Sequence, residues 1–110
     1  MTVRKFMDVS TGHLTRDDVE LLQAGALPIE VLAYEYGWII STAGLMGIDG
    51  VEENAAKLSA SGLSGTFIEV ARAAGARDCW ILRFDADADL DLELPIGGYG
   101  LDVEDASHPG

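Results

Sequence analysis

Acidic and apolar residues alternate along one stretch near the end of the chain, and these carboxylates are the side chains best placed to do chemistry. They occupy every second position, as Asp85, Asp87, Asp89, Asp91 and Glu93. Because successive side chains of a strand point to opposite faces, an extended ribbon would carry all five on one face. Same-face neighbours would lie about 6.6 Å apart, twice the rise per residue. This spacing resembles that of phosphates along a nucleic-acid strand, and it predicts a mimic that binds basic proteins.

Two other interpretations of the same carboxylates stay open. The first is an edge strand whose charges block pairing with another chain. The second is a loose site for a divalent cation, since clustered carboxylates suit hard cations. A helix–loop–helix calcium site is excluded, because that loop needs Gly where Leu90 stands and a bidentate Glu where Ile96 stands. We therefore predict neither a metal site nor another cofactor.

The run Ser10-Thr11-Gly12-His13 is the second group of polar side chains with reactive character. The other histidine, His108, falls in an expected tail, and the single cysteine, Cys79, lies in an apolar run where a buried thiol is expected. No catalytic triad can be assembled from these residues. We therefore predict a structural loop, with Ser10 or Thr11 bound to the backbone, in a protein that is not an enzyme.

Tyr34, Tyr36 and Trp38 alternate in the middle of the chain, which would place them on one face of a strand. Core packing with satisfied polar tips is one interpretation. The other is a contact surface, because tyrosine and tryptophan are favoured at interfaces. On this second interpretation, Tyr34 and Tyr36 join the carboxylates as candidate partner-binding residues.

The charge of the chain supports a basic partner. Among its 110 residues, 19 acids oppose 7 bases, so the net charge is −12. Residues 85–110 contain 8 of the acids and no lysine or arginine. Such a surface repels nucleic acid and anionic membranes and attracts basic proteins. Asp102, Glu104 and Asp105 would extend this field from an acidic, flexible tail at residues 101–110.

Apolar periodicity and capping residues predict the elements that position these groups. In order, they are a strand over 3–9, a helix from the capping box of Thr15 and Asp18 to Gly25, strands over 29–34 and 38–42, a helix over 63–75 with Thr66 and Glu69 as a capping box and Gly75 as its C-cap, and an almost continuously apolar strand over 79–84. The two middle strands form either a hairpin or one long strand bent at Gly37.

This order predicts an α+β fold, a small mixed or antiparallel β-sheet with two main helices packed on one face. Between residues 43 and 65 the pattern predicts only a short acidic helix, with Val51, Ala55 and Leu58 on one face. The whole forms a single domain over residues 1–100. No apolar run approaches the roughly 20 residues that cross a bilayer, and the start lacks the apolar core of a signal peptide, so we expect a cytoplasmic protein.

Three segments carry a resemblance to known proteins: Phe6–Thr15 with its Asp-Val-Ser-Thr-Gly-His-Leu-Thr opening, Tyr34–Trp38, and Cys79–Asp87 with its Phe-Asp-Ala-Asp run. In these the chain resembles a group of short uncharacterised proteins carried by plasmids, phages and genomic islands of proteobacteria. The resemblance implies a mobile-element setting, where small acidic inhibitors of CRISPR effectors and restriction enzymes occur. By analogy we expect a protein that blocks a nucleic-acid-binding defence complex. The alternative is an accessory protein that self-associates as a homodimer, with acidity serving solubility only.

Overall fold

Four strands form one mixed sheet in the computed structural model, which describes residues 5–46 and 50–99. The elements in chain order are β1 (Lys5–Ser10), η1 (Thr11–His13), α1 (Arg16–Ala24), β2 (Val31–Tyr34), β3 (Gly37–Ser41), η2 (Ala43–Leu45), α2 (Val51–Ala60), α3 (Gly65–Ala76) and β4 (Cys79–Asp85). The sheet order is β1-β4-β3-β2, with β1 parallel to β4 and the other neighbours antiparallel. The predicted α+β class is confirmed, and the apolar strand β4 is central.

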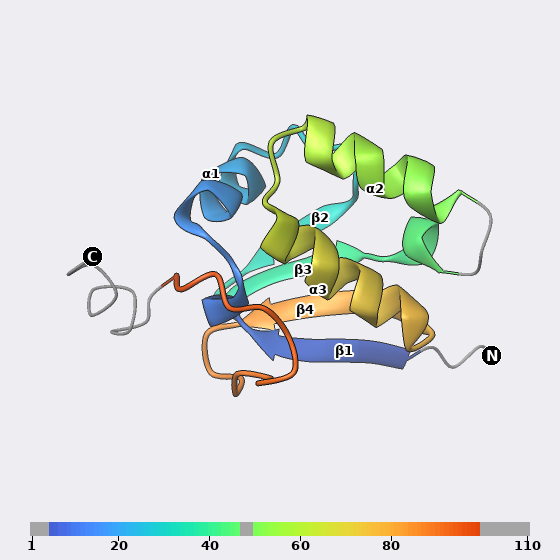
Figure 1. The fold of residues 1–110 in the computed structure, drawn as a ribbon. Helices are drawn as coiled ribbons and strands as arrows, with labels where there is room; N and C mark the ends of the chain where they lie inside the picture. Colours follow the sequence, from blue (N-terminus) through green and yellow to red (C-terminus); the bar gives the residue numbers. More distant parts are fainter. Residues whose placement is uncertain (1–4, 47–49, 100–110) are drawn as a thin grey trace, which may run out of the picture.

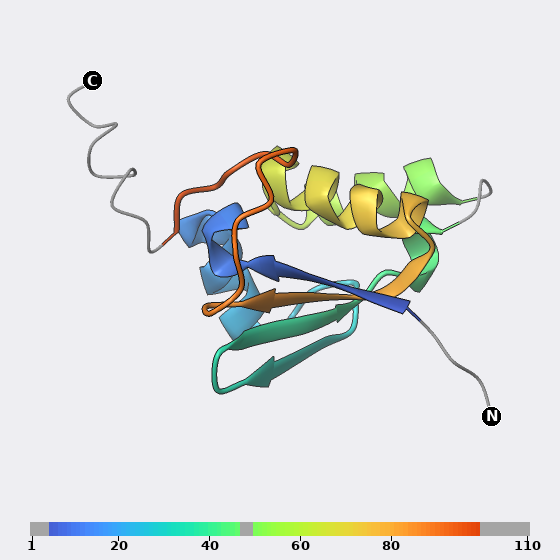
Figure 2. The ribbon, with the colours of Figure 1, turned by 90° about the horizontal axis from the view of Figure 1, so that it is seen from below.

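Two helices, α2 and α3, cover one face of the sheet, and no helix of the described ranges lies on the opposite face (Figures 1 and 2). The helix expected to share that face with α3 was α1. It lies instead at the end of the sheet, because only Leu14 and Thr15 separate it from η1 at the end of β1. Its place on the sheet is taken by α2, which buries Ala55 and Leu58.

The core lies between the sheet and these helices. Phe67 of α3 and Phe84 of β4 are fully buried and stack with ring centroids 5.6 Å apart. Ile40 and Leu82 are also fully buried beside them. Cys79 is buried, as its apolar surroundings predicted. Burying large side chains of this kind supplies most of the favourable free energy of folding.

A single buried carboxylate joins the first turns of two helices. Asp18 completes the predicted capping box of α1: its side chain accepts from Thr15 N at 3.0 Å, and Thr15 Oγ1 accepts from Asp18 N at 3.1 Å. The same carboxylate accepts from Ser64 N at 2.8 Å and from Ser64 Oγ at 2.6 Å. Ser64 is the N-cap of α3, so Asp18 links the starts of α1 and α3.

Both predicted ends of α3 are wrong. Ser64, not Thr66, caps its start, because the Ser64 hydroxyl accepts from Phe67 N and is itself held by Asp18. Gly75 does not end the helix, which continues to Ala76. This glycine is needed for close packing instead: a Cβ there would lie 2.1 Å from the carbonyl oxygen of Leu45 in η2.

Candidate functional site

The expected acidic ribbon is two turns, not a strand. We call residues 85–94 the acidic turn segment; β4 ends at its first residue. The carbonyl of Asp85 accepts from Ala88 N at 3.1 Å, and the carbonyl of Asp91 accepts from Leu94 N at 3.0 Å. The carboxylates of Asp85 and Asp91 also accept from the backbone two residues ahead. Aspartate is disfavoured in strands and favoured at the first position of a turn, so this local chemistry overrides the alternating pattern.

The five carboxylates therefore do not form an evenly spaced row, and the prediction of an extended ribbon is wrong. Asp85 is half-buried and bonded to Tyr34, while Asp91 contacts Arg77 at 3.4 Å. The exposed carboxylates are Asp87, Asp89 and Glu93. The interpretation of the segment as a charged edge strand is wrong for the same reason, since none of residues 86–94 belongs to the sheet.

A buried histidine holds the acidic turn segment in place. His13 is fully buried in η1, its Nε2 accepts from Asp91 N at 2.9 Å, and its Nδ1 lies 2.8 Å from the carbonyl oxygen of Pro95. Because Nε2 faces a donor, the ring hydrogen resides on Nδ1 and is donated to Pro95. Both ring nitrogens are thus hydrogen-bonded to the backbone of residues 91 and 95.

Backbone bonds reinforce this anchor. Gly97 N and Gly98 N both donate to the carbonyl of Gly12, and Tyr99 N donates to the carbonyl of Leu14. A Cβ on Gly97 would lie 2.3 Å from the Leu14 carbonyl, so this close approach requires glycine. Figure 1 shows the segment in orange, looping out from β4 and returning towards α1.

The run from Ser10 to His13 is the structural loop that the sequence predicted, with Ser10 Oγ accepting from Gly12 N at 2.9 Å. Its second role, as the anchor of residues 91–99, was not predicted. The two parts lie about 80 residues apart in sequence, and no local periodicity connects them. The one feature of the sequence that pointed to this anchoring role was an isolated polar histidine, His13, next to the apolar Leu14.

Two of the candidate tyrosines meet the start of the acidic turn segment at the tip of the β2–β3 hairpin. Tyr34 pairs with Gly37 across a two-residue turn, so the hairpin is confirmed and the single bent strand is excluded. Tyr34 donates its hydroxyl to Asp85 Oδ2 at 2.5 Å, and its ring lies edge-on to Tyr36 with centroids 6.4 Å apart. Trp38, by contrast, is buried in the core. The aromatic residues therefore divide between an exposed tip and the core.

The Tyr34–Asp85 bond predicts a distinctive titration. Burial and then the bonded carboxylate raise the pKa of Tyr34 to about 12, and the Tyr34 hydroxyl lowers the pKa of Asp85. An unfolded tyrosine titrates near about 10, so this bond stabilises the fold fully below that pH and is lost as pH rises towards about 12. For Asp85 the contribution is present above about pH 3.9 and is lost as pH falls through its lowered pKa.

Ultraviolet titration of the three tyrosines tests this expectation. Absorbance of tyrosinate in the native protein should show a late step near about pH 12, and the Tyr34→Phe variant should lack that step. Tyr99→Phe is the matched control and should keep it. If Tyr34→Phe lost a titration step at lower pH and kept the step at about pH 12, the step at about pH 12 would not belong to Tyr34.

A groove of about 550 Å³ runs beside this hairpin tip. Tyr34 and Tyr36 line it from the hairpin, Leu22 and Gln23 from α1, and Ala86 from the acidic turn segment. Tyr36 is 49% exposed at its rim. The tip, the groove and Asp87 therefore form one surface in which aromatic rings and carboxylates are neighbours, as at many protein-binding surfaces.

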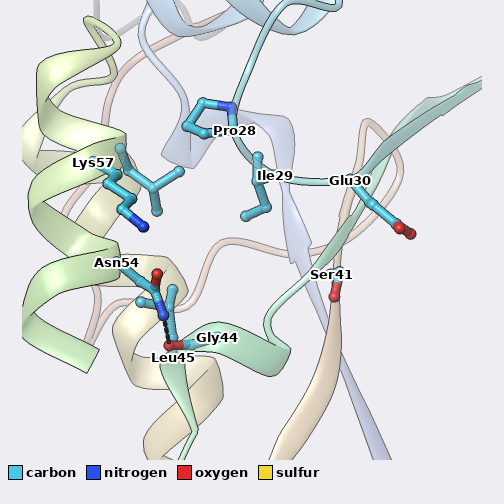
Figure 3. A pocket seen from close by; sticks show the side chains of 9 residues that line it. Pro28, Ile29, Glu30, Ser41, Gly44, Leu45, Asn54 and Lys57 are labelled. Atoms are coloured by element: carbon cyan, nitrogen blue, oxygen red, sulfur yellow. Dashed lines mark hydrogen bonds between the residues drawn. The ribbon is translucent and has the colours of Figure 1, made fainter. Parts of the chain in front are cut away.

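A second hollow of about 280 Å³ lies at the other end of β2, between α2 and the segment before that strand (Figure 3). Ile29 and Lys57 point into it from opposite sides, whereas Glu30 points away. Its polar groups are already engaged: Asn54 donates to the Gly44 carbonyl at 2.8 Å, and Lys57 lies 3.9 Å from Glu53. Few polar groups of this hollow are left to orient a ligand. The groove at the tip of the β2–β3 hairpin is therefore the stronger candidate for a binding site.

The basic side chains are largely neutralised within the molecule. Ion pairs join Lys57 to Glu53, Arg72 to Glu52, Arg77 to Asp91 and Glu93, and Arg83 to Asp8. Within residues 5–46 and 50–99, Asp87 and Asp89 form no ion pair. These two exposed residues are therefore among the acids whose negative charge is not compensated by a neighbouring base.

Across the ranges that the structure describes, no group of three or more His, Cys, Asp or Glu side chains is arranged to hold a metal ion. Over the same residues, no helix has the length and apolar character needed to cross a membrane. The remaining candidate residues, Asp102, Glu104 and Asp105, lie outside the described residues, as does the predicted tail at 101–110.

Comparison with known proteins identifies a family but no relative of known activity. Residues 6–97 match a family model described as "Family of unknown function (DUF5983) C-terminal domain". Neither the curated proteins nor the solved structures contain a match to the chain. The family match begins in β1 and ends at Gly97, so it spans both the sheet and the anchored acidic turn segment. The chain therefore belongs to DUF5983, a family of unknown function, and corresponds to its C-terminal domain.

Proposed function

We propose that this protein is a non-enzymatic binding protein that docks on a basic protein surface. The observation that carries the proposal is the set of exposed carboxylates on the acidic turn segment, Asp87, Asp89 and Glu93, in a chain of net charge −12. His13 and Gly12 hold the second turn and the residues after it, and Asp85 holds the first turn by accepting from Asp87 N and Ala88 N. The segment is therefore ordered before binding and loses little chain entropy when its carboxylates bind a partner. The exposed ring of Tyr36 beside Asp87 supplies an apolar contact.

The partner class follows from charge. Basic surfaces that complement such carboxylates are typical of proteins that hold phosphates, because lysine and arginine neutralise nucleic-acid backbones. A dense carboxylate surface competes for those side chains and accelerates encounter with them. Together with the resemblance to mobile-element proteins, this favours a subunit of a bacterial defence complex, of the CRISPR or restriction type, as the target. Binding there would block access of nucleic acid without any direct contact between this protein and nucleic acid.

Neutralising the exposed carboxylates tests the proposal. The triple variant Asp87→Asn, Asp89→Asn, Glu93→Gln should bind the partner about tenfold more weakly and with a shallower salt dependence, since three exposed charge pairs are lost. The partner is first recovered from bacterial lysate on the tagged protein, eluted by a salt gradient and identified by mass spectrometry. Its affinity for each variant is then measured by calorimetry.

The matched control removes the same charge elsewhere. Asp17→Asn, Glu20→Gln, Glu69→Gln changes three exposed acids on α1 and α3 and should weaken binding far less. Equal losses in the two triple variants would show that only net charge matters and would reject the acidic turn segment as the docking site. Recovery of no basic protein, at low salt, would reject the partner class.

A further inference from the structure

The face of the sheet without a helix carries an apolar patch that the proposed docking site does not use. Its large exposed side chains are Phe6 of β1 (54% exposed), Ile81 of β4 (38%) and Leu32 of β2 (68%). The sheet register sets Phe6 beside Ile81, and Leu32 beside Ile39. Figure 2 shows this side of the sheet turned away from α2 and α3. Exposed apolar patches rimmed by polar residues mark interaction sites.

A neutral ion pair lies next to the apolar side chains. Asp8 pairs with Arg83 in the register of β1 and β4, and Arg83 donates to its carboxylate through Nε at 3.0 Å and Nη2 at 2.9 Å. The guanidinium also lies 5.2 Å from the centre of the Phe6 ring. In a chain of net charge −12, this part of the face is therefore almost neutral. A strongly basic partner finds little to attract it here.

We propose that this face is an interface between two copies of the chain. Consider a twofold axis that runs parallel to β1 and β4, midway between them and between the two facing sheets. It sets Phe6 opposite Ile81 of the second copy and Asp8 opposite Arg83 of the second copy, because these residues are register partners. Each contact then occurs twice, as a closed twofold interface requires. The part of the patch on β1 and β4 is thus complementary to itself in both its apolar and its charged pairs, whereas Leu32 on β2 lies outside this contact.

The size of the patch sets the strength of this association. Two neighbouring strands cover an area of about 200 Å². This is much smaller than the area of about 800 Å² that each partner buries in a stable complex. The dimer is consequently weak, because so small a contact leaves little free energy beyond the entropy lost on association. Two chains of like charge also repel each other, and salt screens that repulsion. Self-association therefore strengthens as salt is added, whereas docking on a basic partner weakens.

Analytical ultracentrifugation of the whole chain tests the interface, from about 10 µM to about 1 mM protein and from about 20 mM to about 500 mM salt. The expected result is a monomer–dimer equilibrium whose dimer fraction rises with both. Ile81→Glu should abolish the dimer. Leu92→Glu, a matched change of an 83% exposed leucine on the acidic turn segment, should leave a dimer. A monomer under all conditions, or a dimer that survives Ile81→Glu, would overturn the proposal.

Charge exchange gives a second, sharper test. Asp8→Arg and Arg83→Asp should each be monomeric, since each places like charges across the axis. Mixed together, the two variants should form a heterodimer, because opposite charges then face each other at both contacts. Circular dichroism should show that each variant is folded, because loss of the partly exposed Asp8–Arg83 ion pair costs little stability. Failure of the mixture to associate would reject the Asp8–Arg83 contact. Because basic-partner binding uses other carboxylates, either proposal can fail while the other stands.

Discussion

Replacing Asp18 with alanine lowers the free energy of unfolding by about 3 kcal/mol or more, because three partly buried donors lose their acceptor at once. The carboxylate is fully buried and accepts from Thr15 N, Ser64 N and Ser64 Oγ. Each buried donor that loses its partner costs about 1–3 kcal/mol, and the capping of α1 is lost as well. For a domain of this size the melting temperature falls by roughly 12–24 °C.

Urea unfolding followed by circular dichroism measures this change. The midpoint should fall while the slope with urea stays constant, since the same surface is exposed on unfolding. Asp17→Ala is the matched control: it removes an exposed carboxylate from the same helix turn and should change stability by less than about 1 kcal/mol. A loss in Asp18→Ala no larger than that of the control would refute the role of Asp18 as a link between the two helices.

Replacing His13 with alanine costs about 2–4 kcal/mol and, in addition, releases the acidic turn segment. The change leaves Asp91 N and the Pro95 carbonyl without a partner in a buried site and opens a cavity where the ring was. Gly12, which accepts from Gly97 N and Gly98 N, is the neighbour of His13 in the chain. Residues 91–98 should therefore lose their anchor together. The variant should therefore bind the basic partner more weakly although every carboxylate remains.

Amide hydrogen exchange separates the two consequences. In His13→Ala, exchange at Asp91, Gly97 and Gly98 should accelerate far more than at the core strand β4. Leu92→Ala provides the control within the segment, since the Leu92 side chain is 83% exposed. Uniform acceleration across the whole domain would mean that His13 supports global stability only. If His13→Ala bound the basic partner with unchanged affinity, anchoring of the acidic turn segment would not be needed for binding.

These two residues connect the scaffold to the proposed docking surface. Asp18 ties α1 to α3, which packs on the sheet, and η1 lies between β1 and α1. His13 in η1 then holds the acidic turn segment beside the end of that sheet. Exposed carboxylates on a flexible chain would lose entropy on binding; the anchor reduces that cost. Two fully buried polar residues thus position the exposed carboxylates of the acidic turn segment.

The sequence by itself determined the features that depend on neighbours along the chain. The capping box of Thr15 and Asp18, the end of α1 at Gly25 and the central place of β4 follow from side-chain spacing and local backbone preference. The choice between a hairpin and one strand bent at Gly37 stayed open until the structure paired Tyr34 with Gly37. The mixed sheet of the α+β fold follows from the order of these elements. The net charge, and with it the class of partner that we propose, needed no structure.

Only the tertiary structure decided which long-range partner each polar group takes. Alternation at residues 85–93 satisfies a strand pattern, which the turn preference of aspartate opposes locally. Tyr34, His13 and Arg77, all outside this stretch, bond to its backbone or carboxylates and fix the two turns in place. Ser64 caps α3 in place of Thr66 because Asp18 reaches it from α1. Together such distant bonds outweigh local propensities, which are well under about 1 kcal/mol per residue. For that physical reason the positions of the carboxylates, and the bare sheet face with its Asp8–Arg83 pair, could be found only in the folded chain.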